Sequence, residues 1–124
     1  MPISVVFADD YEVMRRGIRR LLEADPEIEI LGEAKDYAET MSLTAARSPQ
    51  VVVMDLHMPA PEGFKPIHIK DLMLKTSSRL IAISIWDDRE ANELAADFGA
   101  RVLLDKPTMA LDLIHTIRRV AAAA

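Results

Sequence analysis

The chain has 124 residues, half of them hydrophobic and 28% charged, with a net charge of −5. This is the size and balance of one globular domain of about 100–150 residues. The acidic charge excludes a general nucleic-acid surface, and the absence of cysteine excludes disulfides, zinc–thiolate sites and thiol catalysis.

The first part of the chain predicts a strand, a helix and a second strand. Residues 4–8 form a nearly continuous apolar run, which is typical of a parallel strand covered on both faces. A helical stripe follows, and Pro26 ends it. The stripe comprises Val13, Gly17, Ile18, Leu21 and Leu22. In residues 28–34 the apolar positions alternate, which predicts a strand nearer the edge of a sheet.

The middle of the chain predicts two helices around a buried strand. Asp36 is a suitable N-cap for the first helix, since its side chain can accept a hydrogen bond from a free backbone N–H. The apolar positions of this helix are Tyr37, Met41, Leu43 and Ala45. Residues 51–54 predict the strand. The next helix carries Ile67, Leu72 and Met73, and Pro66 is tolerated only in its first turn.

The last part of the chain predicts two more strand–helix pairs. Residues 80–84 predict a buried strand, and Gly99 is expected to end the helix that follows. That helix carries Ala91, Leu94, Ala95 and Phe98. Residues 101–104 predict the fifth strand. The last helix has its apolar positions at Leu111, Ile114, Ile117 and Val120.

Five alternating strand–helix pairs indicate a doubly wound α/β domain with a five-stranded parallel sheet. A closed barrel of this type needs eight pairs, so the sheet is expected to be open. The expected strand order is 2-1-3-4-5, as in flavodoxin-like (βα)5 folds.

Charged and hydroxyl side chains follow four of the five predicted strands. Asp9 and Asp10 follow the first strand, Asp55 follows the third, Ser84 ends the fourth and Lys106 follows the fifth. The carboxyl ends of parallel strands share one edge of the sheet, which is where such folds bind ligands. These five side chains are therefore expected to converge.

Three clustered carboxylates repel one another unless a cation balances them. Oxygen ligands suit Mg²⁺, which keeps coordination positions free for phosphoryl oxygens. Lys106 then fits as a charge on a phosphoryl group, and Ser84 fits as a hydrogen-bond donor to it. Asp55 could accept the group covalently, because carboxylates form acyl phosphates. Each of these residues alone is more typical of a turn or a cap, so the hypothesis depends on their combination.

This combination resembles the receiver domain of two-component response regulators. The matching motifs are Asp9-Asp10, Asp55 to Pro59, Gly63, Ser84 and Lys106-Pro107. Residues 32–34 and 98–100 are similar to the NarL/FixJ type, whose members usually carry a DNA-binding domain after the receiver. The resemblance covers nearly the whole chain, so residues 1–124 are expected to be one receiver domain, with any output domain outside them.

The resemblance implies a role for each matching residue. Asp55 would be the phosphoacceptor. The Mg²⁺ ligands would be Asp9, Asp10, Asp55 and the backbone carbonyl of His57. Lys106 would pair with a phosphoryl oxygen, and the Lys106–Pro107 peptide bond is expected to be cis. Ser84 would turn toward the phosphoryl group and report its presence to the surface.

Three positions depart from the usual receiver pattern. Leu103 stands where many receivers have a Tyr or Phe that rotates on activation. Ile85 replaces a small residue, and its bulk is expected to narrow access to the phosphoryl group. Trp86 follows at a position that is often polar. The rotating aromatic ring that many receivers use for switching is therefore missing at position 103, while the predicted phosphoryl and Mg²⁺ site is complete.

The leading hypothesis is a phosphorylation-dependent switch that receives its phosphoryl group from a sensor histidine kinase. The implied output is transcription through a separate DNA-binding domain, and homodimerisation on phosphorylation is a further expectation. One alternative is a Mg²⁺-dependent phosphohydrolase with an aspartyl nucleophile, although His57 stands where such enzymes commonly have a general acid. Another is a protein-binding module that does not use phosphorylation, for which Ile85 and Leu103 are the only support.

The chain is expected to work in the cytoplasm, away from membranes. It contains no apolar run near the roughly 18 residues that a membrane helix needs, and no signal peptide is visible at its N-terminus. Its own phosphorylation and dephosphorylation are the only chemistry expected, so it is not predicted to be an enzyme.

Overall fold

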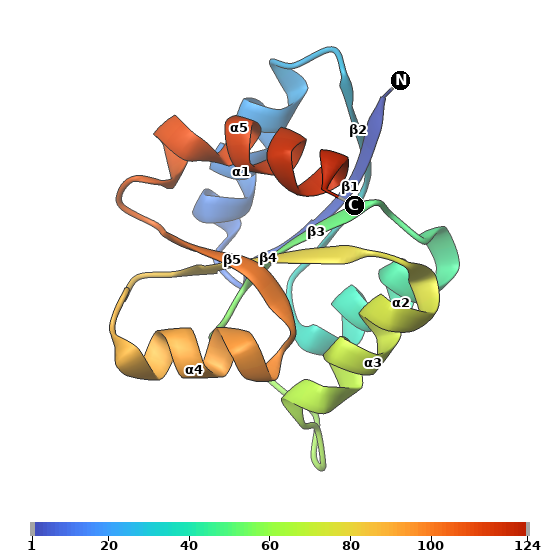
Figure 1. The fold of residues 1–124 in the computed structure, drawn as a ribbon, viewed down its shortest axis with the longest axis vertical. Coiled ribbons are helices and arrows are strands. Elements are labelled where there is room, and N and C mark those ends of the chain that lie inside the picture. The colour runs from blue at the N-terminus through green and yellow to red at the C-terminus, as the bar shows by residue number, and fades with distance from the viewer. Residues whose placement is uncertain (1, 124) are drawn as a thin grey trace.

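A computed structural model describes residues 2–123 as five parallel strands that alternate with five helices (Figure 1). The strands are β1 (Ile3–Ala8), β2 (Ile28–Ala34), β3 (Val51–Asp55), β4 (Arg79–Ser84) and β5 (Ala100–Asp105). The helices are α1 (Glu12–Glu23), α2 (Tyr37–Arg47), α3 (Pro66–Thr76), α4 (Arg89–Asp97) and α5 (Met109–Ala122). The strand order is β2-β1-β3-β4-β5, which confirms the predicted fold.

Helices cover both faces of the sheet, with α1 and α5 on one face and α2, α3 and α4 on the other (Figure 1). Alternate residues of each central strand therefore enter two separate cores. In β1, Val5 and Phe7 pack toward α1 and α5, while Val6 and Ala8 pack toward the other three helices. This two-sided burial explains why the central strands are continuous apolar runs.

The helix boundaries follow local signals in the sequence. Asp36 accepts a hydrogen bond from the backbone N–H of Glu39 at 2.8 Å, which confirms it as the N-cap of α2. Pro66 is the first residue of α3, where no helical N–H bond is lost. Gly99 follows α4 with φ of 79°, a conformation that glycine adopts without steric cost. Gly99 directly precedes β5, so this turn sets where that strand begins.

Five residues of the predicted apolar stripes are exposed instead: Val13, Gly17, Ala45, Ile67 and Leu111. Val13 of α1 is 81% exposed and Leu111 of α5 is 87% exposed. A helix turns by about 100° per residue, so positions four apart share a face. The buried faces contain Ile18 and Leu22 in α1 and the Leu113–Ile117 pair in α5. Val13 and Leu111 fall outside these faces.

We expect truncation of Leu113 to be far more costly than truncation of Leu111. Leu113 is completely buried between α5 and the sheet, so Leu113→Ala should lower the free energy of unfolding by about 2–5 kcal/mol. Leu111→Ala, two residues away, should change it by no more than about 0.5 kcal/mol. Urea unfolding measures both, and equal effects would contradict the assignment of the buried face.

None of the helices in residues 2–123 combines the length and the hydrophobicity that a membrane span requires.

Candidate functional site

Three carboxylates meet at the carboxyl edge of the two central strands β1 and β3. Asp9 and Asp10 directly follow β1, and Asp55 is the last residue of β3, which pairs with β1. One carboxylate oxygen from each lies within 4.8 Å of the other two. Asp9 is fully buried and Asp55 is 3% exposed. The predicted convergence of these residues is confirmed.

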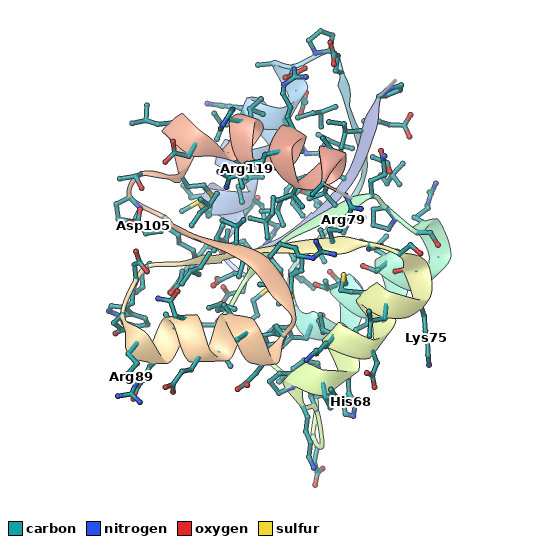
Figure 2. All side chains as sticks on the ribbon, viewed as in Figure 1. His68, Lys75, Arg79, Arg89, Asp105 and Arg119 are labelled. Carbon is teal, nitrogen blue, oxygen red and sulfur yellow. The ribbon has the colours of Figure 1, made fainter. Side chains whose placement is uncertain are left out.

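Lys106 brings one positive charge into this cluster. It follows β5, next to Asp105, which Figure 2 labels at the end of that strand. Its backbone N–H donates to the carbonyl of Ser84 at 2.8 Å, which fixes the start of the loop. Its Nζ lies 2.9 Å from Asp9 Oδ2 and 3.0 Å from Asp55 Oδ2, with the side chain only 8% exposed. One cation therefore faces three carboxylates.

The cluster has the donor set of a hard divalent cation. Among residues 2–123 no group donates to the buried Asp10 Oδ1, and Asp9 Oδ2 has only the ion pair with Lys106. A buried carboxylate oxygen without a partner is costly. All the side-chain atoms offered are oxygens, which suit Mg²⁺. The residues present thus fit the predicted ion.

The excess negative charge affects how these groups hold protons. Burial raises the pKa of Asp55 above its ordinary value of 3.8, hydrogen bonds from the His57 N–H and from Lys106 oppose the rise, and repulsion from Asp9 adds to it. Burial opposes the charge of Lys106, but its bonds with Asp9 and Asp55 outweigh this and raise its pKa. Lys106 is therefore charged at neutral pH, while the ionised form of Asp55 is disfavoured.

We expect Asp55→Asn to stabilise the protein in the absence of divalent cations. The folded protein holds the Asp55 proton more tightly than the unfolded chain, which ionises near pH 3.8. Protonation of Asp55 therefore stabilises the folded protein fully below about pH 3.8. This stabilisation is lost as the pH rises through the raised pKa of the folded state. At pH 7 the free energy of unfolding of the variant should be roughly 0.5–2 kcal/mol higher than that of the wild type.

Thermal unfolding at pH 4 and pH 7 measures this effect. The advantage of Asp55→Asn should be small at pH 4 and should grow toward pH 7. Added Mg²⁺ should reduce it at pH 7, because the cation binds the ionised wild-type site. A variant that is less stable than the wild type at pH 7 without Mg²⁺ would show that the Asp55–Lys106 ion pair outweighs the repulsion.

A cavity of about 200 Å³ opens onto Asp55. Tyr11 and Trp86 are exposed aromatic side chains on its wall, and the Lys106 Nζ lies 5.7 Å from the centre of the Tyr11 ring. The His57 ring contacts the Trp86 ring edge-on, with the two ring centres 5.4 Å apart. The lining residues are Asp10, Tyr11, Asp55, His57, Ile85, Trp86 and Lys106. Tyr11 was not predicted from the sequence as a site residue, although it directly follows Asp10.

The predicted site residue Ser84 ends β4 and does not line the cavity. The residue is fully buried, and its Oγ accepts a hydrogen bond from the Trp86 N–H at 3.1 Å. Ile85 between them is exposed and lines the cavity, as its predicted effect on access requires. The Ser84 hydroxyl is thus tied to the loop that carries Trp86.

The expectation of a cis Lys106–Pro107 peptide bond is wrong for this structure, since the bond is trans. Trans is the lower-energy isomer of X-Pro bonds by about 0.5–1 kcal/mol. With the trans bond, the Lys106 N–H already bonds Ser84 and the Nζ reaches both carboxylates. The contacts of Lys106 therefore do not require the cis form.

Comparison with curated proteins gives relatives of two kinds. The chain is 32% identical over 121 residues to the DNA-binding transcriptional activator DevR/DosR of Mycobacterium tuberculosis, covering 97% of this chain and 55% of the relative. It is 33% identical over 112 residues to a protein-glutamate methylesterase/protein-glutamine glutaminase of Anaeromyxobacter dehalogenans, covering 90% of this chain and 32% of the relative. The chain thus spans a third to about half of these relatives.

The fold and the family agree with these matches. The signal receiver domain of the putative response regulator NarL from Mycobacterium tuberculosis superposes with a TM-score of 0.87 at 25% identity, over 99% of this chain and 98% of that one. The family model described as the response regulator receiver domain matches residues 5–118. The chain therefore belongs to the family of two-component response regulator receiver domains.

Proposed function

We propose that Asp55 is the phosphoacceptor of this receiver and that a sensor histidine kinase supplies the phosphoryl group. The observation that carries the proposal is the position of Asp55 on the cavity, with Lys106 3.0 Å away and two further carboxylates within 4.8 Å. Nucleophile, counter-charge and cation ligands are then present in one place. No other acidic cluster with metal-ligating spacing occurs among residues 2–123.

In the proposed reaction, a carboxylate oxygen of Asp55 attacks the phosphorus of a phosphohistidine in line with the breaking P–N bond. An O–P bond forms, and the electron pair of the P–N bond leaves with the imidazole nitrogen. Lys106 offsets charge on the equatorial oxygens of the transferred group. Asp9, Asp10, Asp55 and the His57 carbonyl would hold Mg²⁺, which supplies further positive charge to those oxygens.

The proposed response passes through Ser84. Its hydroxyl accepts from the Trp86 N–H, so a turn toward a phosphoryl group on Asp55 must break that bond and release the β4–α4 loop. Ligands shift such equilibria only as far as they stabilise one state over the other. Leu103 offers no rotating aromatic ring, so the loop with Ile85 and Trp86 is the route we propose.

We propose that the output of this switch is the control of transcription. We also propose that the protein acts in the cytoplasm, where ATP-dependent kinases are found. DevR/DosR, by its name, is a DNA-binding transcriptional activator. Residues 1–124 would serve as the receiver domain, with DNA contacted by a separate domain and with a homodimer forming on phosphorylation. The methylesterase is matched over only 32% of its length, and we propose no enzymatic activity beyond the receiver's own phosphorylation and dephosphorylation.

The fluorescence of Trp86 is expected to report this switch. It is the only tryptophan, its ring contacts His57, and its N–H bonds Ser84. Mg²⁺ followed by the phosphoryl mimic beryllofluoride should give a small, saturable change in emission. In Asp55→Asn the change caused by beryllofluoride should be absent.

A fluorine NMR spectrum shows independently whether the mimic is bound. If the wild type binds beryllofluoride with no change in Trp86 emission, the β4–α4 loop does not respond and the proposed route is wrong. If the wild type binds neither Mg²⁺ nor the mimic, the proposed phosphoacceptor function itself is wrong.

A further inference from the structure

The loop that follows Asp55 is held by a buried tyrosine from another part of the chain. Tyr37 is the first residue of α2 and is 4% exposed. Its hydroxyl donates a hydrogen bond to the carbonyl of Leu56 and accepts one from the N–H of Met58 at 3.4 Å. One hydroxyl thus binds the backbone on both sides of His57.

The backbone of this loop is otherwise fixed by the site and the sheet. The Leu56 N–H donates to the carbonyl of Ile83 at 2.9 Å, and the His57 N–H donates to Asp55 Oδ1 at 3.0 Å. The His57 carbonyl oxygen has no hydrogen-bond donor among residues 2–123. The residues on either side of it, Leu56 and Met58, are both bound by the Tyr37 hydroxyl.

Two phenylalanines hold the Tyr37 ring in place. Phe64 stacks on it with ring centres 4.5 Å apart and an interplanar angle of 11°. Phe98, the residue after α4, stacks at 5.5 Å with an angle of 26°. Stacked aromatic pairs add stabilisation beyond their buried area. The position of the hydroxyl is thus set by α2, the β3–α3 loop and the end of α4 together.

The hydroxyl also remains able to donate over the whole physiological pH range. Burial raises the pKa of Tyr37 to about 12, the Met58 N–H opposes the rise, and repulsion from Asp55 and Asp10 adds to it. The hydroxyl bonds the residues that directly follow Asp55, so it lies beside the loop that leaves the carboxylate cluster. Tyr37 is therefore a neutral group behind the site, able to bind its loop without adding charge.

We propose that Tyr37 is a positioning residue for the cation site, because its hydroxyl fixes residues 56–58 so that the His57 carbonyl is presented to the ion. The inference rests on the proposed function, in which the His57 carbonyl is a Mg²⁺ ligand. Groups that orient metal ligands from behind commonly change metal affinity about 10–100-fold when removed. The sequence pattern assigned Tyr37 only to the apolar face of a helix.

The test compares two variants that each remove one buried hydroxyl from α2. Tyr37→Phe keeps the aromatic stack and deletes the bonds to the loop. Thr40→Val is the matched control, since the Thr40 Oγ1 bonds the Asp36 carbonyl at 2.7 Å and makes no bond to the loop. Two readouts are used: Mg²⁺ affinity from titration of Trp86 fluorescence, and hydrogen exchange of the Met58 amide in the metal-free protein.

We expect Tyr37→Phe to weaken Mg²⁺ binding by about tenfold and to speed Met58 exchange by a similar factor. Phosphorylation by acetyl phosphate should be slower at low Mg²⁺ and should recover when Mg²⁺ is saturating. Thr40→Val should leave the Mg²⁺ affinity and the Met58 exchange rate within about twofold of the wild type, although it also loses a hydrogen bond of a buried hydroxyl.

Unchanged Mg²⁺ affinity in Tyr37→Phe overturns the inference, and so does an equal loss in Thr40→Val, which would indicate a general effect of stability. A wild type that binds no Mg²⁺ overturns the proposed function instead. In that case the Met58 exchange rate still decides whether Tyr37 holds the loop, because this measurement needs no metal.

Discussion

Asp55→Asn is expected to abolish phosphorylation by a small phosphodonor. Incubation of the wild type with acetyl phosphate and Mg²⁺ should add one phosphoryl group, because Asp55 lies on the cavity beside Lys106 and two further carboxylates. An amide oxygen is a far weaker nucleophile than a carboxylate, so the variant should gain none. The product should be labile at alkaline pH, as acyl phosphates are. Intact-protein mass spectrometry measures both properties.

Asp71→Asn is the matched control for this experiment. Asp71 is an exposed residue of α3 that does not line the cavity at Asp55, and its substitution makes the same change in charge. It should be labelled like the wild type. Equal labelling of Asp55→Asn and the wild type would remove Asp55 as the acceptor and would direct attention to another carboxylate of the cluster.

Lys106→Met is expected to slow phosphorylation by about 10²–10³-fold, the usual effect of removing one group that stabilises transition-state charge. Methionine keeps much of the length and apolar volume of the lysine stem. It removes the only cation within 4 Å of the side-chain carboxylates of Asp9 and Asp55 among residues 2–123. Rates at saturating Mg²⁺, followed by mass spectrometry, isolate the contribution of the lysine from that of the ion.

Lys75→Met controls for the loss of a positive charge elsewhere. Lys75 is exposed near the end of α3 and projects away from the body of the protein (Figure 2). This variant should react at the wild-type rate. A Lys106→Met protein that reacts within about tenfold of the wild type would show that the lysine contributes less charge stabilisation than the usual range.

The sequence by itself determined the fold and the members of the acidic site. Continuous apolar strands and amphipathic helices alternate five times, and this order leaves few arrangements other than an open parallel sheet. Because the strands are parallel, residues that follow them must share one edge. Asp9, Asp10, Asp55 and Lys106 could therefore be grouped before any contact was known, and the structure brings them together.

Only the tertiary structure decided which side chains support and surround that site. The contact of Tyr37 with Leu56 and Met58 joins residues about twenty positions apart, and the edge-on contact of His57 with Trp86 joins two separate loops. Periodicity identifies the face of an element, but it does not say which distant backbone groups that face will meet. Such contacts depend on how neighbouring helices and loops pack, which local sequence patterns do not encode.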